Sequence, residues 1–101
     1  MKKIYFTVTG TKYRYGHDFL EPGMQVQLEK EPDNEYDKEA IAVSVPGLSV
    51  IGYVANSVHT VKGESWSAGR IYDHMGKKAT GTVKVVLPDG VICKLNKAKK
   101  D

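Results

Sequence analysis

Short runs of β-branched, aromatic and aliphatic residues, separated by turn-forming residues, recur along this chain. The run 4–10 is rich in β-branched and aromatic residues, and the run 24–29 alternates apolar with polar residues. The runs 40–45 and 49–55 follow, with a Pro-Gly pair between them. Alternation with a period of two turns one face of a strand inward and the other toward solvent. The pattern therefore predicts four short strands in the first half of the chain, of which the run 24–29 is half-buried.

The second half of the chain adds two short helical patterns and a hairpin. The stretch 57–62 precedes a glycine, and the stretch 64–76 has serines suited to capping its start and ends at a glycine. Residues 78–96 return to a strand pattern, and the Pro-Asp-Gly in their middle predicts a hairpin turn. These elements predict a mostly β fold, a small antiparallel β-barrel of about six strands with two short helices. Trp66 and Tyr72 are expected to pack a helix against this barrel.

Length and composition favour one soluble domain. The chain has 101 residues, of which 41% are apolar and 27% are charged. Its longest apolar runs are only a few residues, so no membrane span is expected, and the N-terminus lacks the apolar region of a signal peptide. Cys93 is the single cysteine, so no internal disulfide can form and a cytoplasmic location is favoured. We interpret Cys93 as a small buried apolar residue.

The net charge of +3 is unevenly distributed along the sequence. Residues 1–50 carry six Lys and Arg against eight Asp and Glu, whereas residues 51–101 carry nine against four. A basic half of this kind suits a polyanionic partner. The lysines of residues 97–101 are interpreted as a frayed, solvated tail.

An acidic stretch, residues 31–39, lies directly before one of the predicted strands, and five of its nine residues are acids. If Asp33 were the first ligand of a calcium loop, Lys38 would stand where Gly is required and Ser44 where Glu is required. One cysteine and three scattered histidines give no paired zinc spacing. No nucleophile–base or phosphate-loop motif occurs either, so we expect neither a cofactor nor an enzyme. The glutamates at 29, 31, 35 and 39 are interpreted as solvated turn residues.

Residues 30–43 also resemble a known signature. They read KEPDNEYDKEAIAV, which is similar to the string Arg/Lys-Glu/Asp-Pro-x-Asn-x-Tyr-Asp-x-x-Ala-Ile-x-Val of the HIRAN domain. VTGTKYRYG at 8–16 and VIGYVANS at 50–57 resemble two further pieces of this family, in the same order. The resemblance covers residues 4 to about 57. It implies a single HIRAN-like domain over 1–101, of the type found alone in bacteria, with a barrel related to the OB fold.

The resemblance implies a function as well. HIRAN domains occur fused to helicases and nucleases, and the studied fork-remodelling member grips single-stranded DNA at its free 3′ end. A similar module here would be non-enzymatic and would act by recruitment in DNA repair, replication or a mobile element. Single-stranded DNA would be its ligand, and a helicase or nuclease a further partner. A carboxylate accepts a hydrogen bond from a terminal 3′-hydroxyl but repels a 3′-phosphate, so one acid in a basic groove can select an end.

Five residues match the family pattern of the DNA-binding site. Lys12 stands where the family has a basic residue for phosphate, and Tyr13 where it has an aromatic residue near the terminal bases. Asn34 and Tyr36 match loop residues that line the pocket, and Asp37 matches the acid that faces the 3′-hydroxyl. The two tyrosines could stack on bases, which tolerates any sequence because every base has a π-face.

Three further positions of the implied site depart from the DNA-binding member. Arg14 stands in place of a second aromatic residue, Tyr53 in place of a histidine, and Asn56 in place of a phosphate-contacting lysine. One cation is therefore lost and another is gained nearby. We expect these departures to make binding weak and strongly dependent on salt.

Structural roles are alternatives for most of these residues. Lys12 and Arg14 also suit solvated charges on an edge strand. Tyr36 suits a plug for the barrel mouth, and Asp37 suits a brace that accepts backbone N–H bonds within its own loop. For the whole chain, the alternative function is a protein–protein interaction adaptor that uses the same barrel without DNA.

Overall fold

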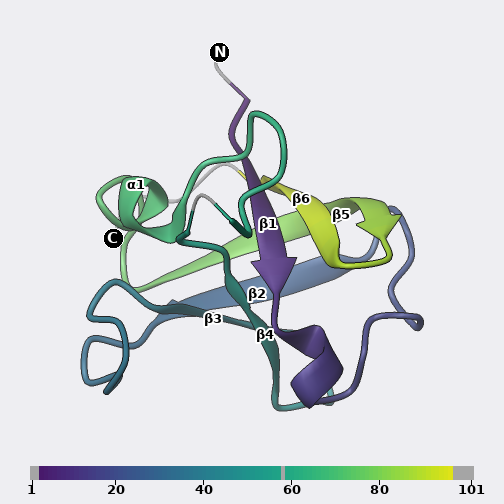
Figure 1. Cartoon of the computed structure of the whole chain (residues 1–101), viewed down its shortest axis with the longest axis horizontal. Coiled ribbons are helices and arrows are strands. Elements are labelled where there is room, and N and C mark those ends of the chain that lie inside the picture. The colour runs from purple at the N-terminus through teal and green to yellow at the C-terminus, as the bar shows by residue number, and fades with distance from the viewer. Residues whose placement is uncertain (1–2, 58, 97–101) are drawn as a thin grey trace.

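Six strands form the core of the fold in the computed structural model, which describes residues 3–57 and 59–96, with the side chain of Tyr13 left out (Figure 1). Two short helical segments accompany the strands. In chain order the elements are β1 (Tyr5–Thr9), η1, a 3₁₀ turn (Thr11–Tyr13), β2 (Gln25–Lys30), β3 (Ile41–Ser44), β4 (Val50–Val54), α1 (Ala68–Tyr72), β5 (Lys78–Leu87) and β6 (Gly90–Leu95).

The strands form a closed barrel in the order β1-β4-β3-β2-β5-β6, and all neighbouring pairs are antiparallel. The predicted mostly β barrel of six antiparallel strands is therefore confirmed. The tight turn between β5 and β6 lies at the predicted Pro-Asp-Gly, where Leu87 pairs with Gly90.

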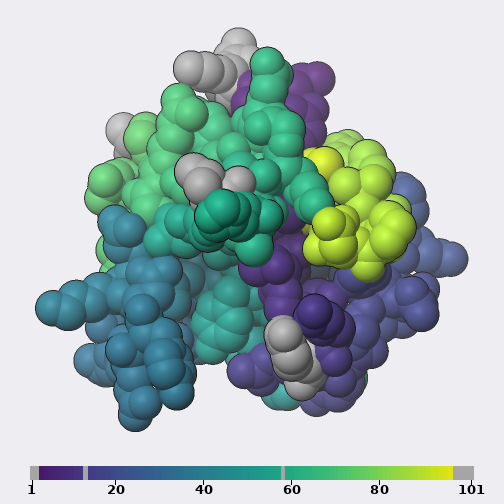
Figure 2. Space-filling view, viewed as in Figure 1, coloured from purple at the N-terminus to yellow at the C-terminus, as the bar shows by residue number. Residues whose placement is uncertain are grey.

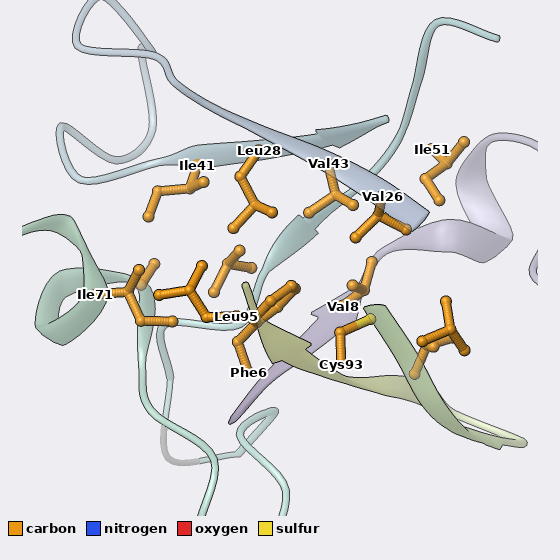
Figure 3. Packing of buried hydrophobic residues seen from close by; sticks show 14 of the residues in the cluster. Phe6, Val8, Val26, Leu28, Ile41, Val43, Ile51, Ile71, Cys93 and Leu95 are labelled. Atoms are coloured by element: carbon orange, nitrogen blue, oxygen red, sulfur yellow. The ribbon is translucent and has the colours of Figure 1, made fainter. Parts of the chain in front are cut away.

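The alternating sequence of β2 explains its place in the barrel wall. Val26 and Leu28 are buried, while Gln25, Gln27 and Glu29 face solvent. All six strands and α1 contribute apolar side chains that meet in the barrel interior (Figure 3). The largest of the fully buried apolar side chains are Phe6, Leu28, Ile41, Ile51, Ile71, Val8, Val26, Val43, Val83, Val91 and Cys93.

Cys93 lies in this core, as the sequence indicated. It is fully buried, and burial raises the pKa of its thiol to about 12. The thiol therefore stays protonated at neutral pH and acts as a small apolar side chain rather than as a nucleophile.

The helix expected over 57–62 is wrong. Among the described residues of this stretch, Ser57 begins a turn in which its carbonyl accepts the N–H groups of Thr60 at 3.0 Å and Val61 at 2.9 Å. The Ser57 hydroxyl also accepts the N–H of His59 at 3.1 Å. Such local side-chain bonds compete with helix formation, and β-branched residues favour the helix little. The described residues thus contain one short α-helix rather than two.

The second predicted helix is confirmed in a shorter form. α1 begins after Ser67, whose hydroxyl accepts the N–H of Arg70 at 3.3 Å. The residues before it are extended because the N–H of Trp66 donates to the Tyr5 carbonyl of β1 at 2.7 Å. Trp66 and Tyr72 pack against the core as expected. Within the described part of the chain, no helix has the length and apolarity needed to cross a membrane.

Gly52 in β4 fixes the position of η1. A Cβ atom at Gly52 would lie 2.6 Å from the backbone oxygen of Thr9, which is closer than real Cβ contacts allow, and 3.1 Å from a methyl carbon of Thr11, which is tighter than most real contacts. Only glycine therefore lets the chain around η1 cross β4 at this distance. This crossing brings Arg14, just after η1, over the outer face of β4.

Candidate nucleic-acid interface

A groove lies between the loop 31–40, which joins β2 to β3, and the segment around η1 (Figure 2). β4 forms its floor, and the blue loop and the purple η1 segment form its two sides in this view. The groove therefore unites residues that are separated by up to about forty positions in the sequence. Seven of the eight predicted site residues have described side chains, and four of these, Asn34, Tyr36, Asp37 and Tyr53, belong to the loop 31–40 or to β4.

Asn34 organises the loop 31–40. Its side-chain oxygen accepts the N–H of Tyr36 at 2.9 Å and the N–H of Asp37 at 3.0 Å. Its amide group donates to Glu31 Oε1 at 3.1 Å. This arrangement satisfies two backbone donors in a turn, which is the usual role of asparagine in loops. Asn34 therefore acts here as an internal brace that sets the directions of Tyr36 and Asp37.

Asp37 is half-buried, and both of its carboxylate oxygens already accept hydrogen bonds. Oδ1 accepts the N–H of Glu39 at 2.9 Å, and Oδ2 accepts the amide of Asn56 at 2.9 Å. The predicted bracing role is therefore present. A carboxylate offers about four lone-pair sites, so two bound donors leave capacity for a further donor such as a hydroxyl. Bracing and ligand recognition are compatible at this residue.

Asn56 links the acidic loop to α1. Its amide donates to Asp37 Oδ2 and, at 3.4 Å, to Glu39 Oε1, while its side-chain oxygen accepts the N–H of Gly69 at 2.8 Å. The side chain lies at the exit of β4 and is exposed. Asn34 therefore accepts the backbone N–H of Asp37, while Asn56 donates to its carboxylate.

Tyr53 forms part of the floor of the groove. Its hydroxyl donates to Glu31 Oε1 at 2.8 Å, and the Arg14 guanidinium lies 5.8 Å from the centre of its ring. The pKa of the Tyr53 phenol is raised, first by partial burial and then by the hydrogen bond and negative charge of Glu31, with Arg14 acting in the opposite direction. The ring is thus fixed between a cation on one side and the acidic loop on the other.

Comparison with known proteins identifies the fold family. The family model described as "HIRAN domain" matches residues 1–84. The chain belongs to the HIRAN domain family. HIRAN domains are a family of DNA-binding modules. The matched range runs from β1 into β5 and contains all eight residues of the predicted site.

One solved structure supports the fold of this HIRAN domain. A crystal structure of a protein from Lactobacillus plantarum, determined by a structural genomics consortium, is 24% identical with a TM-score of 0.63, over 93% of each chain. At this identity the likeness shows that the two chains share a fold. No curated protein matches the chain.

The remaining predicted site residues of this HIRAN domain, Tyr36, Lys12 and Tyr13, lie in different surroundings. The side chain of Tyr36 is 93% exposed, so the alternative role as a plug for the barrel mouth is wrong. Lys12 is exposed and lines a hollow bounded by η1, residues 59–62 and the β5–β6 turn. Tyr13 lies in η1, and its side chain is outside the described part of the structure.

Glu31 is the site residue that sequence reasoning missed. It was expected to be a solvated turn residue, but it is half-buried and accepts hydrogen bonds from both Tyr53 and Asn34. It therefore ties the floor of the groove to the acidic loop. The sequence feature that could have indicated a role for Glu31 was its position in the signature string, directly before the proline.

The described residues give no arrangement suited to holding a metal ion. Within 3–57 and 59–96, no three His, Cys, Asp or Glu side chains are grouped as ligands. Three acids of the loop, Glu31, Asp37 and Glu39, instead accept hydrogen bonds from a backbone N–H group, from Asn34, from Asn56 and from Tyr53. The chemistry of this groove is hydrogen bonding and ring contact.

Proposed function

We propose that this HIRAN domain binds single-stranded DNA and holds a free 3′-hydroxyl end in the groove between the loop 31–40 and η1. The observation that carries the proposal is the fixed position of Asp37, held between Asn34 and Asn56 beside the exposed ring of Tyr36. An acceptor that is already oriented loses little freedom when a ligand binds.

The charges around the groove support selection of an end. The strand approaches over Arg14 and Lys12, which attract phosphates. It then meets the loop 31–40, where five acids surround a single lysine. A strand that continued past Asp37, or that carried a 3′-phosphate, would place negative charge against these acids. A terminal hydroxyl adds a hydrogen-bond donor without charge and is therefore accepted.

The rings supply binding that does not depend on sequence. Tyr36 offers both ring faces to solvent, and Tyr53 is covered on one side by Arg14. Tyr13 is a third candidate for contact with bases or sugars. Because every base stacks on an aromatic ring, the site would accept any sequence at the strand end.

A module that binds a DNA end without catalysing a reaction would act by recruiting other proteins. The module would recruit another activity to a DNA end, with a helicase or nuclease as the partner. Repair, replication or mobility of DNA in the cytoplasm is the setting in which such ends arise.

Fluorescence anisotropy with end-labelled oligonucleotides tests this function directly. Oligonucleotides that end in a 3′-hydroxyl should bind more tightly than the same strands with a 3′-phosphate, and a 3′-deoxy end should lie between them because it loses the donor without adding charge. Asp37→Asn should reduce the preference for the hydroxyl over the phosphate. Glu35→Gln, which makes the same charge change on an exposed side chain of the same loop, is the matched control and should retain the preference.

Three outcomes would contradict the proposal in different ways. Equal binding of all three ends would leave only a basic surface that binds any strand. If no strand binds at low salt, the adaptor function becomes the better account. Unfolding of Asp37→Asn, measured by circular dichroism, would show that the residue acts only as a brace.

Tyr36→Ala tests the stacking contribution. Stacking of a base on a ring is worth about 1–3 kcal/mol, so affinity for single-stranded DNA should fall by roughly 5- to 150-fold. The unfolding midpoint should stay unchanged because the ring is 93% exposed. Tyr36→Phe keeps the ring and should bind nearly as the wild type does. Retention of full affinity by the alanine variant would remove Tyr36 from the site.

A further inference from the structure

A second hollow, of about 470 Å³, lies beside the groove. It is bordered by η1, by residues 59–62 and by the turn between β5 and β6, drawn in purple, teal and yellow-green in Figure 2. This volume is within the roughly 300–1,000 Å³ of small-ligand sites. The lining residues that carry charge or a ring nitrogen are Lys12, His17, His59, Lys62 and Asp89.

The charged groups of the hollow come from three separate segments. Lys12 belongs to η1, Lys62 to the segment that follows β4, and Asp89 to the β5–β6 turn. The Lys62 ammonium donates to Asp89 Oδ2 in an ion pair. The Asp89 side chain is 70% exposed, whereas that of Lys62 is 29% exposed. The carboxylate thus reaches the lysine from the solvent side.

The backbone around these groups is firmly attached to the barrel. The N–H of Lys62 donates to the buried hydroxyl of Thr7 in β1 at 3.1 Å. Thr11, also buried, forms a hydrogen bond of 2.6 Å from its hydroxyl to His17 Nδ1. The positions of Lys62 and His17 are therefore set by the fold rather than by the ligand.

The lining selects the chemical class of a ligand. Two ammonium groups and two imidazoles are groups that bind phosphate oxygens. Among the described residues of the lining there is no Phe, Tyr or Trp ring on which a base would stack. Asp89, the one acidic residue of the lining, is already paired with Lys62. A phosphate group fits this set better than a base or a cation does.

We propose that the hollow binds a backbone phosphate of the DNA strand, and that this phosphate replaces Asp89 as the partner of Lys62. The assignment of the phosphate to a strand rests on the proposed function. η1 borders both the groove and the hollow, since Arg14 covers Tyr53 while Lys12 lines the hollow. The hollow therefore receives a phosphate some nucleotides away from the 3′ end, and Asp89 weakens this contact by competing for the lysine.

The first experiment needs no DNA. Inorganic phosphate is titrated into ¹⁵N-labelled protein, and amide shifts are followed by NMR. Saturable shifts are expected at residues 12, 60 and 62, and Lys62→Gln should abolish them. Lys84→Gln, which removes an exposed lysine of β5 outside the hollow, is the control and should keep the shifts. Absence of shifts in the wild type would overturn the proposed site.

The second experiment asks whether the phosphate belongs to a strand. A dinucleotide is compared with an oligonucleotide of about ten nucleotides, within the roughly 4–16 covered by OB-type grooves. For the longer strand, Lys62→Gln should weaken binding and reduce the salt slope by about one, while Asp89→Asn should tighten binding several-fold. Neither change should affect the dinucleotide. Asp73→Asn, an exposed acid next to α1, is the charge-matched control.

The outcomes separate the two proposals. Phosphate shifts in a protein that binds no DNA would mean that the proposed function fails and the hollow serves a free phosphate. DNA binding with an intact end preference, but no effect of Lys62 or Asp89 on the longer strand, would overturn the strand contact alone. The Lys62 variant should fold normally because its bond to Thr7 uses the backbone N–H.

Discussion

The acidic loop and the basic hollow of this HIRAN domain are built in opposite ways. The five acids of the loop come from nine consecutive residues, and local hydrogen bonds through Asn34 and Asp37 hold them. The positive groups of the hollow come from η1 and the segment after β4, and only the closed barrel brings them together. The backbone turn of the acidic loop is therefore held by local bonds, with Tyr53 and Asn56 adding contacts to the barrel, whereas the basic side depends on the fold throughout.

This difference predicts how each region responds to damage. A change in the barrel wall should displace the basic side and leave the acidic loop largely intact. A change within the loop should disorder the acids without moving the lysines. Three variants test this contrast, in order of decreasing expected effect.

Gly52→Ala should have the largest effect and should act on the basic side. The added Cβ would lie 2.6 Å from the Thr9 oxygen. Because this is a backbone atom, no change of side-chain rotamer can relieve the clash. Overpacking of this kind costs about 1–3 kcal/mol, so the unfolding midpoint in urea should fall and the amides of η1 should shift. Gly69→Ala is the matched control, because its Cβ would meet only the mobile end of the Glu39 side chain. Equal destabilisation by the two variants would contradict the role assigned to the η1 crossing.

Asn34→Ala should act mainly on the acidic loop. It removes three hydrogen bonds of a partly buried side chain, at about 1 kcal/mol each or less, and we expect a loss of about 1–2 kcal/mol. Faster amide exchange at 35–37 should accompany it. Asn34→Asp keeps the acceptor for both N–H groups and should restore most of that protection. If exchange in the loop were unchanged by the alanine variant, the loop would be held by other contacts.

Glu31→Gln should have the smallest effect and should appear in the titration of Tyr53. The pKa of this phenol should fall toward its ordinary value but stay somewhat raised, because partial burial is the largest cause of the shift. A raised pKa stabilises the fold below about pH 10, and this contribution is lost as the pH rises through the folded value. The variant should therefore lose less stability in alkali than the wild type does. The carbon shift of the Tyr53 ring, followed by NMR, measures the pKa, and Glu35→Gln should leave it unaltered.

Sequence patterns predicted the barrel well because its determinants are local. The alternation of Val26 and Leu28 with polar neighbours, and the Pro-Asp-Gly turn, each specify one strand or one hairpin. The helix expected over 57–62 failed because a serine hydroxyl and β-branched residues favoured a turn. That prediction relied on the capping residues at the ends of the stretch and did not take into account the low helix propensity of the β-branched residues between them.

The candidate site could be predicted only in part. Asn34, Tyr36 and Asp37 share one short string, so their proximity follows from the sequence. The roles of Glu31 and Asn56 depend on partners in other segments, since Tyr53 and Gly69 contact them only after the barrel closes. The pairing of Lys62 with Asp89 spans a larger separation still and had no local signal.

Closure of the barrel also limits how another protein could associate with this domain. Each of the six strands already has a hydrogen-bonded neighbour on both sides. A partner chain cannot extend such a sheet by adding a strand of its own, which is a common means of peptide capture. A helicase or nuclease that this module recruits would have to recognise its exposed side chains and loops, so substitutions of exposed residues should weaken recruitment while the barrel stays folded.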